Sequence, residues 1–538
     1  MTRAIKILEE KGKGGVKASK GRGGRFWLTF FAVFVTAFLS AVDLTIISPI
    51  LPTIAEELPR GDTTVSPAWI TSAFLATAAS FQPLFGGLSD AIGRREALIT
   101  AIMIFLVGSI VACVAQDLLT VVAGRGVQGM GGGGMLVVGE VIISDMTTLA
   151  ERGYFLGLLS IAFAVAALAA PIAGGWFATF DWRVAFYINF PIGAIAILML
   201  LPTKLNKPKL SLKEKFERMD LVGSLVLFGA IVSLLIGLTN GGVSAPWSSA
   251  EIATPLGLGA AGLVLFFVLE FVPNPLCSYP ILPAKLFRHR TAAISYALTF
   301  LHGVILYGAT QGLVVYFENR GSSPLKAAVN ILPANAPSTP AAFIAGVIMA
   351  VTGKYKGQII VSEILMTLGI GLFIYLDLTS STAEWAIFQV IGSFGLGALY
   401  SLTLPPIQAT LPASELAHAT ATFAFSRSFG AVWGVSAFLI AFQVESGQRL
   451  TNIPGATEAG INGSTAINYV PIISTIPVEL RAPVSQAFQD AIRIGFIALV
   501  PFAGLGLVLS FLIKHVPLPD FNDSQYGVEG QQQQRAKQ

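Results

Sequence analysis

Two charged side chains stand inside long apolar stretches, where their chemistry could couple a proton to a movement of the chain. Asp43 lies 17 residues into the first stretch, and Arg125 lies 7 residues into the fourth. If both stretches are membrane-crossing helices, Asp43 lies about 25 Å above the inner end of its helix and Arg125 about 10 Å below the outer end of its own. Because a charge inside a bilayer costs several kcal/mol without a partner or a task, we expect them to pair. Arg125 would hold Asp43 ionised until substrate or a conformational change frees Asp43 to take a proton; a static pair that only fixes helix packing is the alternative.

Several uncharged or titratable side chains lie in the same kind of stretch. A histidine side chain ordinarily titrates near physiological pH, so His302 is a candidate proton carrier, although a core histidine with satisfied hydrogen bonds explains it as well. Gln128 is one turn from Arg125 on the same helix face. Side chains of this kind either line a cavity or bond neighbouring helices. The candidates for cavity lining are Gln82, Gln128, His302, Tyr307 and Gln311.

Other kinds of chemistry find no support. The four histidines are widely scattered, which gives no metal-ligand cluster. The run Gly131–Gly134 follows no strand, so we interpret it as close helix packing rather than a phosphate loop. We therefore expect no enzyme activity, no cofactor and no nucleotide. The net charge of +4 fits anionic lipid headgroups rather than nucleic acid.

The composition decides which elements position these residues. Of 538 residues, 54% are hydrophobic and 12% are charged, and the mean hydropathy is +0.72. A soluble domain typically carries about 25% charged residues, so most of this chain must face lipid. Lipid leaves backbone amides without outside partners, which restricts the spans to helices or closed barrels. Apolar runs of about twenty residues fit helices. The sequence therefore predicts an all-α polytopic membrane protein.

The apolar runs number fourteen, with twelve as the alternative count. The prolines 333, 337 and 340 interrupt the tenth run, and Glu363 stands near one end of the eleventh. The expected spans begin near Phe26, Pro67, Ala97, Leu118, Tyr154, Val184, Leu221, Ile252, Ala292, Ala327, Gln358, Trp385, Leu416 and Ile494.

The basic residues set the orientation. With both termini in the cytosol, 25 of the 34 lysines and arginines lie on that side and 7 lie outside. This asymmetry follows the positive-inside rule. The sequon at Asn462, which continues to Ser464, then falls in an outer loop, where it predicts a glycoprotein.

A short motif occurs twice, once in each half of the chain. Gly86–Arg95 follows the second span, and a degenerate copy, Gly346–Lys354, follows the tenth. Their glycines allow helix ends to approach closely, and Asp90 can pair with a nearby arginine. We expect a charge lock that holds one conformation; a solvated turn is the alternative. The lock residues are Gly86, Asp90, Gly93, Arg94 and Arg95.

This loop resembles the signature of the major facilitator superfamily, G-x-L-x-D-x-x-G-R-[RK]. Further stretches resemble the fourteen-span drug:proton antiporter branch, close to fungal exporters of drugs or secondary metabolites. They include Arg125–Gly131 and the end of the antiporter motif at Pro171, Gly174 and Gly175, although alanines 166 and 170 replace two of its glycines. The resemblance implies two six-helix bundles plus two inserted helices. Rocking of one bundle against the other would alternate access to a central site.

The repeat and the resemblance divide the chain. Glu140 and Glu363 are expected at cytosolic helix ends, as interfacial residues, and Arg427 is expected to stabilise the second bundle. The expected segments are a cytosolic basic tail (1–25), the N-terminal bundle (26–203), a cytosolic linker (204–220), two inserted spans (221–271), a second linker (272–291), the C-terminal bundle (292–513) with a long outer loop (443–490), and a cytosolic tail (514–538).

The function that follows is proton-coupled efflux of hydrophobic small molecules. We expect the plasma membrane as the location, with the vacuolar membrane as the alternative, and a monomer whose partners are its substrate, protons and the lipid bilayer. Uptake or vacuolar transport of a siderophore or an amino acid on the same fold is one alternative. A membrane sensor that no longer transports is the other.

Overall fold

The computed structural model describes residues 23–518, except for 60–66, 68, 204, 206–209, 218, 243–244, 274–278 and 464–465. Within these residues the regular elements are helices, with one isolated bridge between Gly241 and Ala245. The expectation of an all-α fold is confirmed. Most of the two tails predicted to be cytosolic, and parts of both linkers, lie outside the described residues.

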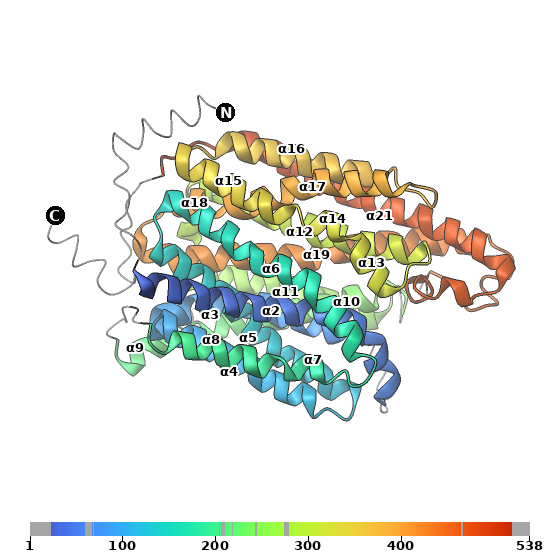
Figure 1. Ribbon diagram of the computed structural model, residues 1–538, viewed down its shortest axis with the longest axis horizontal. Coiled ribbons are helices and arrows are strands. Elements are labelled where there is room, and N and C mark those ends of the chain that lie inside the picture. Colours follow the sequence, from blue (N-terminus) through green and yellow to red (C-terminus); the bar gives the residue numbers. More distant parts are fainter. Residues whose placement is uncertain are drawn as a thin grey trace.

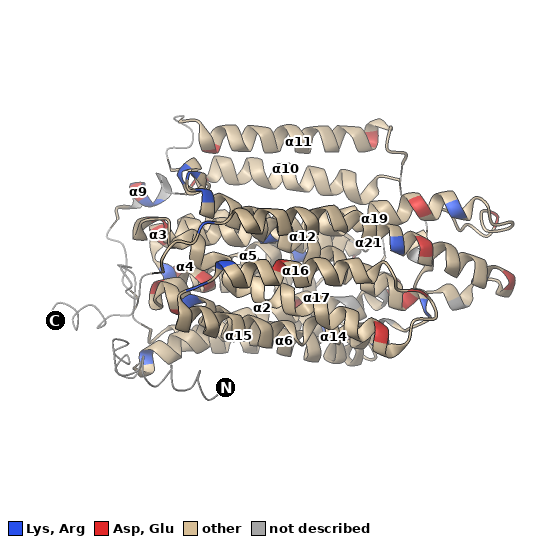
Figure 2. Cartoon of the chain, turned by 90° about the horizontal axis from the view of Figure 1, so that it is seen from above, with Lys and Arg blue, Asp and Glu red and all other residues tan. Residues whose placement is uncertain are grey.

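The helices form two groups (Figure 1) and a separate pair (Figure 2). The first group comprises α2 (Gly24–Glu57), α3 (Trp69–Ile92), α4 (Arg94–Cys113), α5 (Leu118–Met146), α6 (Leu149–Phe177), α7 (Val184–Tyr187) and α8 (Asn189–Leu200). The second comprises α12 (Arg290–Asn319), α13 (Pro324–Asn330), α14 (Leu332–Asn335), α15 (Ser338–Thr352), α16 (Lys356–Phe373), α17 (Thr382–Leu402), α18 (Leu404–Gln408), α19 (Leu416–Leu450) and α21 (Val478–Leu512). The pair is α10 (Leu221–Asn240) and α11 (Ala250–Phe271), and the short α9 (Leu212–Glu217) and α20 (Ala466–Tyr469) lie in connections.

Twelve helices of the described residues are long and apolar enough to cross a membrane. They correspond to twelve of the fourteen expected spans. The second, α3, is 24 residues long but carries Gln82 and Asp90, and the sixth contains only the 12-residue α8 after α7. α3 is largely buried and packs against α5, α19 and α10, whereas α8 packs against α2 and α4 and leaves Ile195 and Leu198 exposed. The count of fourteen therefore remains a prediction.

Charged residues gather at the two ends of the helices and are sparse along the middle (Figure 2). This distribution is the one that a bilayer imposes, because charges within the hydrocarbon core need partners. We call the end where α2 begins and α21 ends the inner end, and the opposite end the outer end, following the expected orientation.

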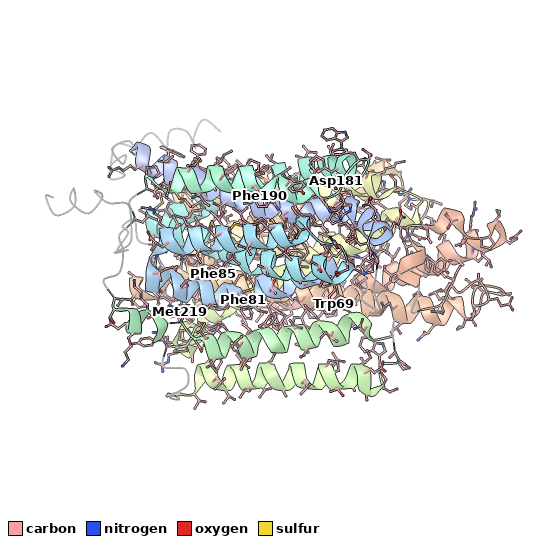
Figure 3. The ribbon with its side chains drawn as sticks, turned by 90° about the horizontal axis from the view of Figure 1, so that it is seen from below. Trp69, Phe81, Phe85, Asp181, Phe190 and Met219 are labelled. Carbon is pink, nitrogen blue, oxygen red and sulfur yellow. The ribbon has the colours of Figure 1, made fainter. Side chains whose placement is uncertain are left out.

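The inserted pair packs on the seam between the two groups. Leu227 and Ile231 of α10 share a buried cluster with Ala76 of α3 and Phe425 of α19. Phe81 lies on the part of α3 near α10 (Figure 3), and its ring centroid is 5.6 Å from that of Phe228. The pair therefore contacts both groups, while α11 keeps most of its surface exposed.

The segment expected as a long outer loop, 443–490, is largely helical. α19 continues to Leu450 and α21 begins at Val478, so both project from the outer end (Figure 1). Phe442, Ile461 and Phe488 are fully buried there. A sequence interpretation based on membrane-length apolar runs does not detect such a segment, because polar and charged residues such as Glu445, Arg449 and Asp490 interrupt its apolar runs.

Glycines on α5 allow neighbouring backbones to touch. A Cβ on Gly133 would lie 2.3 Å from the carbonyl oxygen of Ala78 on α3, and one on Gly131 would lie 2.5 Å from that of Ala101 on α4. Small residues let membrane helices approach in this way. The interpretation of the glycine run as close packing agrees with these contacts.

We predict that Gly133→Ala destabilises the protein, because the added methyl group meets backbone that cannot move aside. Overpacking of this kind costs about 1–3 kcal/mol. The thermal midpoint of the detergent-solubilised protein, followed by size-exclusion chromatography, measures the effect. Gly371→Ala on α16 is the matched control, since a Cβ there meets nothing within 4 Å. Equal midpoints for the two variants would contradict the packing argument.

Candidate functional site

The structure places Asp43 at the centre of a buried polar cluster formed by four helices. Its Oδ2 accepts a hydrogen bond from Arg125 Nη1, and the pair is a salt bridge with no exposed surface. Its Oδ1 accepts from Gln128 Nε2 at 3.0 Å and from Asn189 Nδ2 at 3.1 Å. Both amides also donate to the Ser109 hydroxyl, at 2.9 and 3.1 Å. Both carboxylate oxygens of Asp43 are therefore satisfied.

Arg125 is held by more than its carboxylate. Its Nε donates to the Ile70 carbonyl at 3.1 Å, its Nη1 donates to Gln128 Oε1 at 2.9 Å, and its guanidinium carbon lies 4.4 Å from the Phe74 ring centroid. These contacts fix the cation on α5 independently of Asp43. A proton on Asp43 would remove the ion pair and leave Arg125 in place, so two states of this cluster differ by one proton.

The antiporter-motif residues lie on α6. A Cβ on Gly174 would lie 2.7 Å from the carbonyl oxygen of Ile46, which presses α6 against α2 one turn after Asp43. Pro171 is half-buried within α6, and Gly175 has nothing within 4 Å of its Cβ position. Of the three, Gly174 makes the close helix contact.

The lock residues form an ion network at the inner end. Arg94 bridges Asp90 and Asp145, with its Nε 2.9 Å from Asp145 Oδ2. Gly93 has a φ of 103°, which lets α3 turn directly into α4. The other oxygen of Asp90 faces His418 Nδ1 of α19 at 3.4 Å. Through His418 the network reaches the second group.

The remaining lock residues have different surroundings. A Cβ on Gly86 would lie 2.4 Å from the Cβ of Ala421, so α3 and α19 touch here. Arg95 points away from the network, and its Nη1 donates to the Thr203 carbonyl at 3.2 Å. The structure thus brings Asp90, Gly93 and Arg94 together, while Gly86 packs against α19 and Arg95 bonds elsewhere.

A second inner contact between the groups was not anticipated from the sequence. Arg152 of α6 donates to Gln408 Oε1 of α18 at 2.6 Å and to the Ser144 carbonyl at 2.6 Å. Gln408 Nε2 in turn donates to the hydroxyls of Ser144 and Thr420, at 3.0 and 2.8 Å. Arg152 stands near the beginning of its span, where a basic residue is also expected from orientation alone, so the sequence carries no further signal. Together with the lock, this contact joins the groups at the inner end.

Glu140 and Arg427 correct two sequence interpretations. Glu140 of α5 is 1% exposed rather than interfacial. Its Oε1 accepts from Arg427 Nη2 of α19 at 2.8 Å, and the Tyr400 hydroxyl is 3.4 Å away. Arg427 therefore joins the two groups instead of stabilising the second one alone. Position near a helix end suggested water, but α19 covers this face of α5.

Glu363 is also buried rather than interfacial. It is fully inaccessible on α16, and neither carboxylate oxygen has a hydrogen-bond partner among the described residues. Its Oε2 lies 2.8 Å from the Cβ position of Gly506, so it faces α21. A carboxyl in such surroundings is neutral, because an unpaired charge there costs several kcal/mol.

The other candidates for cavity lining divide into two sets. His302 is buried, and its Nε2 lies 3.0 Å from the Leu396 carbonyl, which favours the structural interpretation. Gln82 is 1% exposed and its amide oxygen has no hydrogen-bond partner. Tyr307 and Gln311 stay partly accessible on α12, and Tyr307 lies within electrostatic reach of Arg427.

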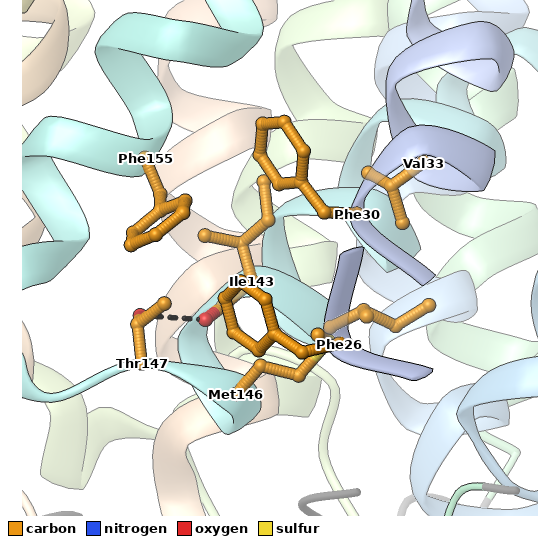
Figure 4. Close-up of a pocket in the computed structure, with 8 residues that line it drawn as sticks. Phe26, Phe30, Val33, Ile143, Met146, Thr147 and Phe155 are labelled. Carbon is orange, nitrogen blue, oxygen red and sulfur yellow. Dashed lines mark hydrogen bonds between the residues drawn. The ribbon is translucent and has the colours of Figure 1, made fainter. Parts of the chain in front are cut away.

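Three further features bear on other sites. Asn462 is half-buried in the outer segment, and Ser464 of its sequon lies outside the described residues. The described residues contain no group of three or more metal-ligating side chains. A pocket between the inner ends of α2, α5 and α6 is lined by Phe26, Phe30 and Phe155 among others (Figure 4), but it has no room for a water molecule.

Comparison with known proteins gives one consistent result. Residues 33–435 match the sequence model of the Major Facilitator Superfamily. The chain is 44% identical over 508 residues to the MFS-type efflux pump MMF1 of Pseudozyma antarctica (strain T-34), which covers 94% of this chain and 93% of that protein. It is 42% identical to the MFS-type efflux pump MMF1 of Mycosarcoma maydis, over 97% of this chain and 84% of that protein. The solved structure of the human organic anion transporter MFSD10 (TETRAN) superposes with a TM-score of 0.55 at 14% identity, over 92% of this chain and 100% of that one.

We predict that Asp90→Asn opens the inner end. The variant loses the charge opposite Arg94 and His418, and removing one partner of a buried pair costs about 3–5 kcal/mol. Arg94 keeps its bond to Asp145, so the closed inner end loses less free energy than that. A loss of about 1.4 kcal/mol is enough to change the equilibrium between closed and open inner ends tenfold. Ala417→Cys, in a chain with serine at 113 and 277, reports the opening because Ala417 is buried between α5 and α19. Its labelling by a membrane-impermeant maleimide in inside-out vesicles should rise about tenfold.

Asp117→Asn is the matched control for this measurement. Asp117 caps α5 at the outer end, where it accepts from the Thr120 amide at 2.7 Å, and that bond holds its pKa below the ordinary value. The substitution removes one carboxylate far from the lock. Unchanged labelling in Asp90→Asn, or equal labelling in the two variants, would show that the lock does not hold the inner end closed.

Proposed function

The chain belongs to the Major Facilitator Superfamily and is an efflux transporter rather than an enzyme, and we propose that protons entering through Asp43 drive it. The observation that carries this proposal is the Asp43 cluster. Its fully buried carboxylate accepts hydrogen bonds from three side chains, one of which is the cation Arg125. The ionised carboxylate pairs with Arg125, and when Asp43 is protonated Arg125 keeps its hydrogen bonds to the Ile70 carbonyl and to Gln128. Such a carboxyl group can carry a proton across a barrier.

The cluster lies where a conformational change can reach it. Asp43 is on α2, and Arg125 and Gln128 are on α5, which also carries Glu140 and Asp145. Arg125 and Glu140 are separated by about 22 Å along the same helix. A tilt of α5 during rocking of the groups would alter the Asp43 cluster and both contacts to the second group together. This mechanical link supports coupling between proton uptake and access to the centre.

We propose that one transport cycle runs through the inner contacts. In the state described here the lock and the Arg152–Gln408 contact join the groups at the inner end. Proton uptake at Asp43 from the outer side, with release of substrate outward, would be followed by opening of these contacts and loading of substrate from the cytosol. Release of the proton inward would return Asp43 to Arg125.

We propose that the substrates are hydrophobic small molecules, such as drugs, toxins or secondary metabolites. The relatives reported above are efflux pumps of fungi, and the resemblance to fungal exporters supports the same class. We also propose the plasma membrane as the location, with N- and C-termini in the cytosol. A monomer is sufficient, because both groups and all three charged clusters lie in one chain.

We predict that Asp43→Asn abolishes proton-driven efflux while the protein still reaches the membrane. Asparagine keeps the volume and one acceptor, but it cannot exchange a proton. Accumulation of a panel of hydrophobic drugs and fungal metabolites in yeast stripped of its own pumps, with and without a protonophore, measures the effect. The intact chain should lower accumulation several-fold, and the protonophore should remove that difference.

Asp377→Asn is the matched control, because Asp377 stands in an exposed outer turn where it accepts from Thr379. It should export like the intact chain. Export by Asp43→Asn that still collapses with the protonophore would assign the proton to another group. Higher accumulation with the intact chain would indicate uptake, and no change despite surface expression would favour the vacuole or a sensor.

A further inference from the structure

The Glu140–Arg427 pair is bonded differently from the Asp43 cluster. Arg427 Nη2 donates to Glu140 Oε1 at 2.8 Å, but Glu140 Oε2 and Arg427 Nη1 are both buried without a hydrogen-bond partner. In the Asp43 cluster both carboxylate oxygens accept hydrogen bonds. The atoms of that cluster that lack a partner among the described residues, Arg125 Nη2 and Asn189 Oδ1, lie within the first group and not between the groups. The Glu140–Arg427 pair joins α5 of the first group to α19 of the second. These two groups rock against each other in the proposed cycle. The pair thus offers one unused acceptor and one unused donor at the interface of the groups.

Aromatic rings frame the guanidinium group. The guanidinium carbon of Arg427 lies 4.8 Å from the Tyr400 ring centroid and 5.1 Å from that of Phe423. Cation–π contacts at these distances fix the orientation of the cation. Rings beside a polar centre also offer apolar surface to the remainder of a ligand.

Tyr307 lies close to the same ion pair. It lies near the middle of the 30-residue α12 and within electrostatic reach of Arg427, yet its side chain keeps partial access to solvent. The side chain of Arg427 is itself 11% exposed. A mid-helix side chain that is accessible and close to a cation between the groups faces the interior rather than lipid.

The unused atoms and the net charge define what this space can hold. A buried donor or acceptor without a partner costs about 1–3 kcal/mol, and a ligand group that supplies the missing partner removes that cost. The ion pair has a net charge of zero, so a charged ligand here would be a third, uncompensated charge. An uncharged group that both donates and accepts fits both atoms, with its oxygen toward Arg427 and its hydrogen toward Glu140.

We propose that Glu140, Arg427, Tyr307 and Tyr400 form a substrate subsite that recognises a hydroxyl or an amide group on an otherwise apolar, uncharged molecule. This subsite rests on the proposed export function and specifies its substrate class. The neutral pair makes it selective against ions of either sign. Each partner is thereby a specificity-determining residue.

The proposal predicts that neutralising one partner changes the preferred charge of the substrate. Glu140→Gln leaves Arg427 uncompensated and favours anions, whereas Arg427→Gln leaves Glu140 uncompensated and favours cations. Export is measured in pump-stripped yeast for cycloheximide, which carries a hydroxyl and an imide, for anionic fluorescein and for cationic rhodamine 6G. The intact chain should prefer cycloheximide, and each single variant should shift the ratio of ion to cycloheximide export by about tenfold or more, in opposite directions.

The double variant separates specificity from stability. Glu140→Gln combined with Arg427→Gln restores a net charge of zero and should restore the preference for cycloheximide. Glu445→Gln is the matched control, because Glu445 pairs with Arg449 at the outer end and should leave all ratios unchanged. Each single variant could instead lower the export of all three compounds by one common factor. That result would show that the pair only stabilises the contact between the groups, and it would overturn the subsite.

A measurement on the purified full chain does not depend on export. Tyr307→Cys, with serine at 113 and 277, is labelled by cationic and anionic methanethiosulfonate reagents, with rates normalised to free cysteine. The ratio of anionic to cationic rates should rise about tenfold or more in Glu140→Gln and fall as much in Arg427→Gln. Absent labelling, or a ratio that neither substitution changes, would overturn the subsite. Charge-dependent labelling without any export would keep the subsite and refute the export function.

Discussion

The structure depends on the inability of lipid to solvate a charge. Within the helix groups each buried charge must be paired, be neutral or face water, and three clusters of the described residues follow that constraint. Asp43 pairs with Arg125, Glu140 pairs with Arg427, and Arg94 joins Asp90 to Asp145. Glu363 has no hydrogen-bond partner among the described residues, which is compatible with burial only when its carboxyl is neutral. These pairs place specific helices side by side, since a misplaced helix would leave a charge alone.

α5 takes part in all three paired clusters. Arg125, Glu140 and Asp145 stand along it from the outer to the inner end, and their partners lie on α2, α19 and α4. The same helix carries the glycines that let α3 and α4 touch its backbone. Close packing and charge pairing therefore act together: a bulkier residue in the glycine run would move the backbone and lengthen the ion contacts. α5 thus links a group suited to hold a proton with the contacts that join the two groups.

The two contacts between the groups differ in depth and in completeness. At the inner end, Arg152 and Gln408 engage in short hydrogen bonds, and the lock reaches His418. Deeper in the interface, Glu140 and Arg427 leave a donor and an acceptor unused. Among the described residues, the inner contacts leave Arg152 Nε and His418 Nδ1 without a hydrogen-bond partner, but only the deeper pair leaves an acceptor and a donor on the two members of one ion pair. Water or a substrate group that both donates and accepts can supply those two missing bonds. This difference is the physical basis for assigning them different roles.

The sequence by itself determined the solvent, the fold class and the family. Composition required lipid, run length required helices, and the Gly86–Arg95 loop supplied the family resemblance, since these signals are local along the chain. Counting residues from the helix ends also placed Asp43 and Arg125 at a similar depth in the membrane, because the rise per helical residue is constant. Tertiary structure alone decided which faces meet. In the folded chain α19 covers Glu140, and Arg427 bonds to Glu140 across the interface. Glu363 is buried against α21, and α19 and α21 continue beyond the membrane-length segments. A sequence gives the distance of a residue from a helix end, but whether water or another helix occupies the space beside it depends on residues hundreds of positions away.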